Sequence, residues 1–213
     1  MSHRWTRLRT TLRRHRWQAT IAGLTAATGI ALVPGAAYAD APPASGKVAS
    51  YVGALQPNAF YCGPAATRIA LSAHGVLPSF DDLAVALGTT QSGTASIFEV
   101  TRVLNGIYGE DRYTSVEMSN RTVAAKQVKK MRSDVISGIN QGDPIVANVK
   151  GTVTDTAGEV HSYNGGHYVT ITGYANSGDL VTVTDPADAV GSNEYQVPIR
   201  VMADWVATRG YTY

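Results

Sequence analysis

Two neighbouring stretches of alternating β-branched residues constrain the fold of this chain most. Tyr168–Thr172 and Leu180–Thr184 flank a turn-forming segment, residues 175–179, that contains Asn, Gly and Asp. Alternation with a period of two indicates strands, and a short polar turn between two strands predicts an antiparallel hairpin. The fold must therefore contain an antiparallel sheet with at least one buried face.

The side-chain pattern of this hairpin predicts its register. Pairing Val169 with Val183 keeps the apolar residues on one face. The same register pairs Ile171 with Val181, whereas a one-residue slip would exchange the two faces.

The predicted register also places His167 opposite Asp185. Even a two-residue shift leaves the two residues diagonal neighbours, about 7–8 Å apart. A carboxylate there can accept an imidazole N–H and stabilise the imidazolium. An Asp before Pro186 also serves simply to turn the chain, so this pair needs a third reacting group to indicate chemistry.

Cys62 is the only cysteine of the 213 residues, so no disulfide can form within the chain. Apolar residues recur at helical spacing after Cys62 until Gly75, and Pro64 suits a first helical turn, which places Cys62 at a helix N-terminus. The helix dipole there lowers the pKa of a thiol and favours the nucleophilic thiolate, and Gly63 leaves room for a substrate backbone. A buried, unreactive thiol is the alternative.

Beyond residues 1–39, the chain has only three histidines as candidates for the base that serves this thiol. His74 is predicted near the end of the Cys62 helix, roughly 18 Å from Cys62, so it cannot act as the base for this thiol. We expect it to complement the negative end of the helix dipole instead. His161 falls in a polar stretch, residues 155–164, that we expect to be a loop with a solvated imidazole. His167, which follows two glycines and begins a strand, is the remaining candidate.

The N-terminal region predicts export. Six arginines and no acidic residues occupy the first 17 positions, followed by an apolar stretch at 19–33 and the sequence Ala37-Tyr38-Ala39. We therefore expect residues 1–39 to be a secretory signal peptide, cleaved after Ala39, and the mature protein to be extracellular. The apolar stretch is shorter than a membrane span and contains Gly and Thr, so no stable membrane insertion is expected after cleavage. Residues 40–50 are predicted to be a flexible leader.

The charge distribution excludes a nucleic-acid partner. The whole chain has a formal charge of +2, but without residues 1–39 it has 12 basic and 16 acidic residues, a net charge of −4. A phosphate-binding surface needs clustered Lys and Arg in the folded part. Lys126, Lys129, Lys130 and Arg132 form one local cluster, which we interpret as a solvated helix face.

Further elements are predicted from periodicity and capping signals. Helices are expected at 79–87, at 96–107 with a Ser96/Glu99 capping box, at 122–140, and at 197–208. Residues 144–149 are expected to form a buried strand. No Cys or His spacing is typical of a metal site.

Gln56 six residues before Cys62-Gly63, Gly-Gly-His at a strand start and Asp-Pro at the end of the next strand together resemble papain-like cysteine peptidases. The resemblance is to the bacteriocin-processing, double-glycine-cleaving peptidases and their secreted stand-alone relatives. It implies an α+β papain-like fold over residues 51–213, in which a helical half with Cys62 faces a twisted antiparallel sheet with His167 and Asp185. For Gln56 it implies an oxyanion-hole donor beside the Cys62 N–H.

The predicted function is a secreted cysteine hydrolase that cleaves a peptide or amide bond of a peptide or protein substrate. Cys62 would form a thioester, His167 would act as base and acid, and Asp185 would orient His167. This chemistry requires no cofactor. Two alternatives stay open: an acyl-transferring transpeptidase or transglutaminase with the same residues, and a papain-like binding module with an inert thiol. The sequence carries no signal for an oligomeric state.

Overall fold

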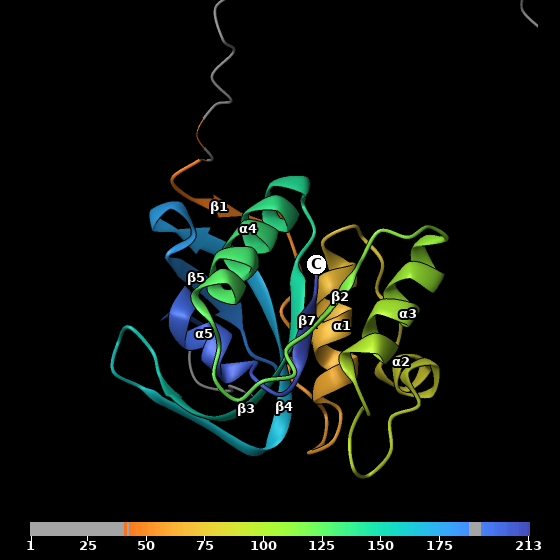
Figure 1. Cartoon of the computed structure of the whole chain (residues 1–213). Helices are drawn as coiled ribbons and strands as arrows, with labels where there is room; N and C mark the ends of the chain where they lie inside the picture. Colours follow the sequence, from red (N-terminus) through yellow and green to blue (C-terminus); the bar gives the residue numbers. More distant parts are fainter. Residues whose placement is uncertain (1–40, 42, 188–192) are drawn as a thin grey trace, which may run out of the picture. The chain divides into compact units, whose positions relative to one another are not determined.

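An antiparallel sheet lies at the centre of the fold in the computed structural model, which describes residues 41, 43–187 and 193–213 (Figure 1). The predicted signal peptide lies outside the described residues. The strands follow the order β2-β7-β3-β4-β5-β6, and β1 pairs with β4. Their bounds are Gly46–Lys47 (β1), Ser115–Glu117 (β2), Ile145–Thr154 (β3), Val160–Ala175 (β4), Leu180–Thr184 (β5), Glu194–Pro198 (β6) and Gly210–Thr212 (β7).

Helices lie on both sides of the sheet (Figure 1). On one side are α1 (Cys62–Ser72), α2 (Phe80–Leu87) and α3 (Ile97–Tyr108); on the other are α4 (Ala125–Gln141) and α5 (Ile199–Trp205). Helices were thus predicted in the right places, but the last one is shorter than 197–208 because β6 continues to Pro198. The Ser96/Glu99 capping box is wrong: the Ser96 side chain makes no capping bond, and Glu99 binds Arg102 instead.

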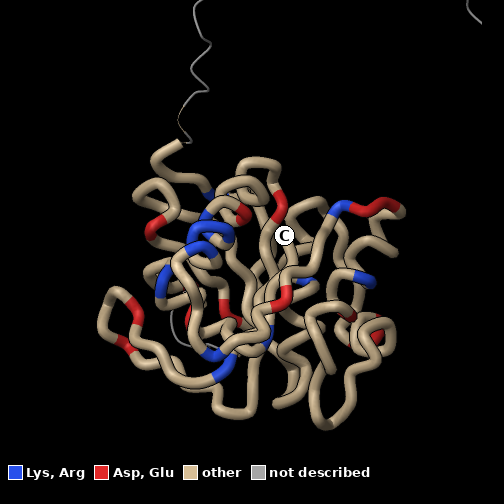
Figure 2. The backbone as a smooth tube through the Cα atoms, in the orientation of Figure 1, with Lys and Arg blue, Asp and Glu red and all other residues tan. Residues whose placement is uncertain are grey.

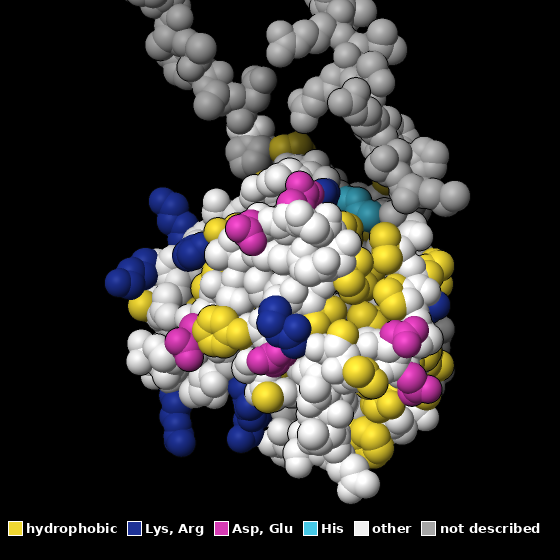
Figure 3. Space-filling model, turned by 90° about the vertical axis from the view of Figure 1, so that its right-hand side faces the viewer, with side chains coloured by type: hydrophobic (Ala, Val, Ile, Leu, Met, Phe, Trp, Pro, Cys, Tyr) yellow, Lys and Arg dark blue, Asp and Glu magenta, His cyan; other side chains and the backbone are white. Residues whose placement is uncertain are grey.

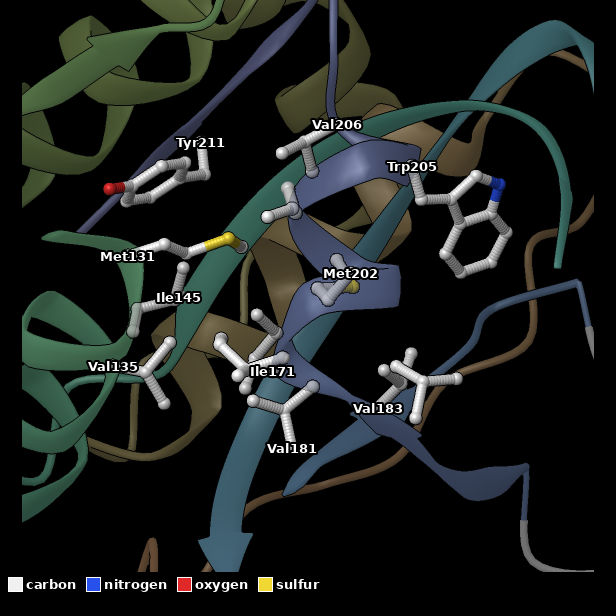
Figure 4. Packing of buried hydrophobic residues seen from close by; sticks show 14 of the residues in the cluster. Met131, Val135, Ile145, Ile171, Val181, Val183, Met202, Trp205, Val206 and Tyr211 are labelled. Carbon is white, nitrogen blue, oxygen red and sulfur yellow. The ribbon is translucent and has the colours of Figure 1, made fainter. Parts of the chain in front are cut away.

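Two hydrophobic clusters hold these layers together, one on each face of the sheet. The larger one joins α4 and α5 to the sheet, and Figure 4 shows Met131 and Val135 of α4, Met202 of α5 and Ile171 of β4 within it. The smaller one packs α1, α2 and α3 against the opposite face through Val146 and Tyr168. Because both faces are covered there, the first half of β3 and the second half of β4 are almost continuously buried.

The hairpin of β4 and β5 forms as predicted, but its register differs by two residues up to Ile171 and by three residues beyond Gly173. Ile171 pairs with Val183 and Thr170 with Thr184, and a bulge follows between Ile171 and Gly173. The turn contains a short 3₁₀ helix, Asn176–Gly178. The two-residue shift keeps the four predicted apolar side chains together in the larger cluster, so the hydrophobic pattern alone could not distinguish the two registers; these are Val169, Ile171, Val181 and Val183.

Residues 155–164, predicted as a loop, instead continue the sheet. β3 pairs with β4 from Ile145 opposite Ile171 out to Thr154 opposite Val160, so only the intervening residues turn the chain. His161 is consequently not solvated: it is 8% exposed and contacts Asp155 across 3.2 Å. The segment is polar because the ends of β3 and β4 pair only with each other there, and side chains on one face of this pair are exposed to water.

Part of the segment predicted as a flexible leader, residues 40–50, lies on the sheet. Gly46 and Lys47 form β1 opposite Tyr174 and Gly173, and Val48 is buried in the larger cluster. Lys47 also contacts Glu194 on β6.

Surface side chains are distributed unevenly. Basic residues gather on α4 (Figure 2), where Lys126, Lys129 and Lys130 are exposed as predicted. Figure 3 shows apolar side chains on the face that carries α1–α3, and Val85 and Phe98 of these helices are exposed. No helix in the described part of the chain is long and apolar enough to span a membrane.

Candidate active site

Cys62 is the first residue of α1, as predicted, and its side chain borders a small cavity of about 130 Å³. The turn before it is closed by the Ala65 N–H, which donates to the Tyr61 carbonyl. Pro64 has no N–H to leave unpaired at this helix start. The thiol is 8% exposed, so it is largely shielded from water while it remains at the cavity wall.

His167 reaches the same cavity from β4. Gly166, the residue before it, has a φ of +102°, a backbone conformation that residues other than glycine rarely adopt. The pairing of β3 with β4 is irregular at the same place, between Val149 and Gly151 of β3. The His167 imidazole lowers the pKa of the Cys62 thiol, and both side chains line this cavity. The Gly-Gly-His sequence therefore shapes the approach of the imidazole to the thiol.

Asp185 lies just after β5 and binds His167 from behind. Its Oδ1 is 2.7 Å from His167 Nε2, and the carboxylate is completely buried. In the observed register Asp185 is diagonal to His167 rather than directly opposite. The two side chains bridge this offset, so their predicted contact forms despite the different register.

Sequence reasoning missed two further partners of Asp185. The hydroxyls of Tyr163 and Tyr195 both donate to Asp185 Oδ2, at 2.9 and 2.7 Å, and the Ala187 N–H donates to Oδ1. The Tyr163 ring also stacks on His167, with centroids 3.9 Å apart. Tyr163 lies in the segment that was predicted as a loop, and Tyr195 lies on β6, a strand for which the sequence contains no motif. The only sequence signal for these two tyrosines is a weak alternation of large side chains.

Electrostatics in the site favour a thiolate–imidazolium pair. Burial opposes ionisation of Cys62, but the hydrogen bond and charge of His167, with the backbone N–H groups of Tyr168 and Gly63, lower the pKa of the thiol overall. Burial also opposes the imidazolium, yet Asp185 and Cys62 raise the pKa of His167 to about 9. For Asp185, burial is outweighed by His167, Ala187 and Tyr195, so its pKa lies below the ordinary value. Both shifts favour the ion pair of a Cys62 thiolate and a His167 imidazolium.

Gln56, the predicted oxyanion donor, lies in the segment before α1. Its backbone N–H donates to Pro186, directly after Asp185, and its side-chain Nε2 donates to the Asn58 carbonyl at 2.7 Å. An amide nitrogen carries two hydrogens, so one donor remains beyond the Asn58 bond. The Gln56 Oε1 is buried without a hydrogen-bond partner in the described part of the chain.

Gly63 has a further role besides the room for a substrate backbone that the sequence suggests. A Cβ at this position would overlap the Oγ1 and Cβ of Thr94, a cavity-lining residue. Thr94 is also bound through its carbonyl by the Tyr168 hydroxyl, which in turn accepts from Asn148. The absent side chain thus allows the loop of Thr94 to pack on the helix start, rather than only leaving space for substrate.

The other two histidines in the described part of the chain, His74 and His161, lie outside this cavity. His74 follows the end of α1 and binds Asp143 at 2.8 Å instead of only complementing the dipole, and Arg112 binds the same carboxylate. His161 stacks on Tyr195 with centroids 3.6 Å apart and so supports a ring that binds Asp185. The described residues contain no group of three or more side chains able to hold a metal ion.

A helix-borne thiol facing a His–Asp pair on an antiparallel sheet is the arrangement of the papain-like α+β fold, as predicted. The sequence profile of the Peptidase_C39 like family matches residues 48–213, and the chain belongs to this family. Comparison with curated proteins gives no match.

Two solved structures show the same fold. A C39-like peptidase from Bacillus anthracis is 12% identical, with a TM-score of 0.55 over 79% of this chain and 96% of that one. The peptidase domain of Streptococcus ComA, a bifunctional ABC transporter of a quorum-sensing pathway, is 16% identical, with a TM-score of 0.50 over 77% of this chain and 97% of that one.

Proposed function

We propose that this protein is a secreted cysteine peptidase that cleaves a peptide or amide bond through a thioester on Cys62. One observation carries the proposal. The buried Asp185 carboxylate binds His167 Nε2 at 2.7 Å, and His167 lines the same cavity as Cys62 and lowers the pKa of its thiol. Membership of the Peptidase_C39 like family supports the same chemistry.

The reaction follows from this geometry. Because Nε2 binds Asp185, Nδ1 is the His167 nitrogen that serves the thiol. The thiolate attacks the substrate carbonyl carbon, and the Cys62 N–H, together with the remaining Gln56 amide donor, stabilises the oxyanion. His167 then protonates the leaving amine as the C–N bond breaks, which leaves a thioester. Finally His167 removes a proton from water, and the resulting attack on the thioester releases the acid and restores the thiol.

Labelling tests the proposed activity. A peptidyl epoxide that alkylates active-site cysteines should modify the native protein at Cys62, whereas the Cys62→Ser variant should stay unmodified, as intact mass would show. Labelling only after denaturation would contradict a catalytic role and indicate an inert binding module. With a cleaved peptide in hand, product mass in the presence of added amine separates hydrolysis from acyl transfer.

Export has its own test. The basic head and the Ala37-Tyr38-Ala39 sequence support cleavage after Ala39, so protein collected from the medium of a secreting host should begin at Asp40. Secreted protein that still contains the first 39 residues would contradict this.

A further inference from the structure

Arg209 lies on the wall of the cavity that contains Cys62 and His167. Its backbone is held on both sides at the start of β7: its N–H donates to the Val206 carbonyl, and its carbonyl accepts from the Met118 N–H. The guanidinium lies over Gly166, where a Cβ would approach Arg209 Nη2 to 3.4 Å. The glycine before the catalytic histidine thus also makes room for an arginine beside it.

The Arg209 side chain differs from the other half-buried arginines that the structure describes. Arg68 donates to the Pro78 carbonyl, Arg112 binds Asp143, and Arg132 pairs with Asp179. Among the described residues, none forms a hydrogen bond or ion pair with the Arg209 guanidinium. A planar fork of donors is thus presented to the cavity without a protein acceptor.

The charge of the cavity favours an anion. Its described lining contains no carboxylate, because the Asp185 carboxylate lies behind His167 and is bound to it, and Arg209 is the lining residue whose positive charge has no protein partner among the described residues. The Glu99 carboxylate, on the α1–α3 side, is bound to Arg102. Arginine is the side chain whose geometry best matches a carboxylate, because two parallel N–H groups can bind its two oxygens.

We infer that Arg209 determines substrate specificity by binding a carboxylate close to the scissile bond. The carboxylate is either an acidic side chain of the substrate or its free C-terminus; both present the same group to the guanidinium. This inference rests on the proposed peptidase function, since it places the recognised group beside the reacting carbonyl. It assigns a substrate class, peptides with a carboxylate near the cleaved bond.

Alkylation of Cys62 tests the inference without a known substrate. Iodoacetate and iodoacetamide react with the same thiolate, but only iodoacetate carries a carboxylate, so the ratio of their rates cancels differences in thiolate population. Arg209→Gln should lower the iodoacetate-to-iodoacetamide ratio about tenfold, the value of one charge-assisted hydrogen bond. Arg209→Lys, which keeps the charge without the fork, should give an intermediate ratio.

Arg121→Gln is the matched control, because it removes one positive charge at an exposed position outside the cavity and should leave the ratio unchanged. A folded Arg209→Gln variant with the wild-type ratio would overturn the role of Arg209 while leaving the peptidase proposal intact. Failure of native Cys62 to react with either reagent would overturn the proposed function and this inference with it.

Peptide substrates identify the source of the carboxylate and need no variant. The first set consists of C-terminally amidated peptides that carry either Glu or Gln at one position near the cleaved bond. The second set consists of peptides with neutral side chains that have either a free or an amidated C-terminus. The wild-type protein should cleave the carboxylate member of one set at least about tenfold faster in kcat/KM. Preference in the first set indicates a side chain, preference in the second a C-terminus, and equal rates in both would overturn the inference.

Discussion

Replacing Asp185 with Asn removes a charge from the site with little change in shape. The Asp185 carboxylate is completely buried and accepts four hydrogen bonds: Oδ1 from His167 and the Ala187 N–H, and Oδ2 from the hydroxyls of Tyr163 and Tyr195. An Asn oxygen in the Oδ1 position keeps the first two bonds. The Asn NH₂ then faces two hydroxyls, which must rotate to accept from it.

The size of the effect follows from the lost charge. A hydrogen bond to an ionised acceptor is about twice as strong as a neutral one, so the imidazolium loses roughly 1–2 kcal/mol of stabilisation. This makes the thiolate–imidazolium pair about five- to thirtyfold less populated relative to the neutral pair. Less thiolate forms at a given pH, so the thiol titration moves to higher pH and the alkylation rate at neutral pH falls by up to the same factor.

The assay is the rate of Cys62 alkylation by iodoacetamide as a function of pH, read by intact mass. Asp143→Asn is the matched control, since it makes the same change at another buried aspartate that binds a histidine, His74, outside the cavity. The control should keep the wild-type profile. If the folded Asp185→Asn variant keeps the wild-type pH profile, the Asp185 charge does not stabilise the His167 imidazolium, and this explanation of the lowered thiol pKa is refuted.

Three further expectations follow from the same contacts. Cys62→Ser should abolish turnover but change the free energy of unfolding by no more than about 1 kcal/mol, as urea denaturation would show; activity in this variant would exclude Cys62 as the nucleophile. Because the pKa of His167 is raised to about 9, peptide hydrolysis should fall as the pH rises through that value, whereas alkylation of the thiolate should not; parallel losses would assign the titration to another group. Gly63→Ala should destabilise the fold by about 1–3 kcal/mol through overlap with Thr94, and adding Thr94→Ala should restore most of this loss; equal stability of Gly63→Ala and the wild type would contradict that contact.

Much of the candidate site could be predicted because its signals are local in the sequence. A cysteine before Gly-Pro and a run of alanines identifies a helix start by itself, and an alternating stretch after Gly-Gly-His identifies a strand by itself. The contact between His167 and Asp185 was also predictable, since hairpin neighbours stay close even when the register shifts by two residues. The helices at 79–87 and 96–107 were found for the same reason, from periodicity within one segment.

The sequence by itself therefore determined the helix that begins at Cys62, the two strands of the hairpin, and the contact between His167 and Asp185. The tertiary structure decided what surrounds them: the exact register of β4 and β5, the extension that buries His161, and the tyrosines that bind Asp185. Arg209 reaches the cavity only because β7 pairs with β3, far from it in sequence. Such contacts depend on which strands become neighbours, and a pattern with a period of two reports the face of a side chain but not its partner across the sheet.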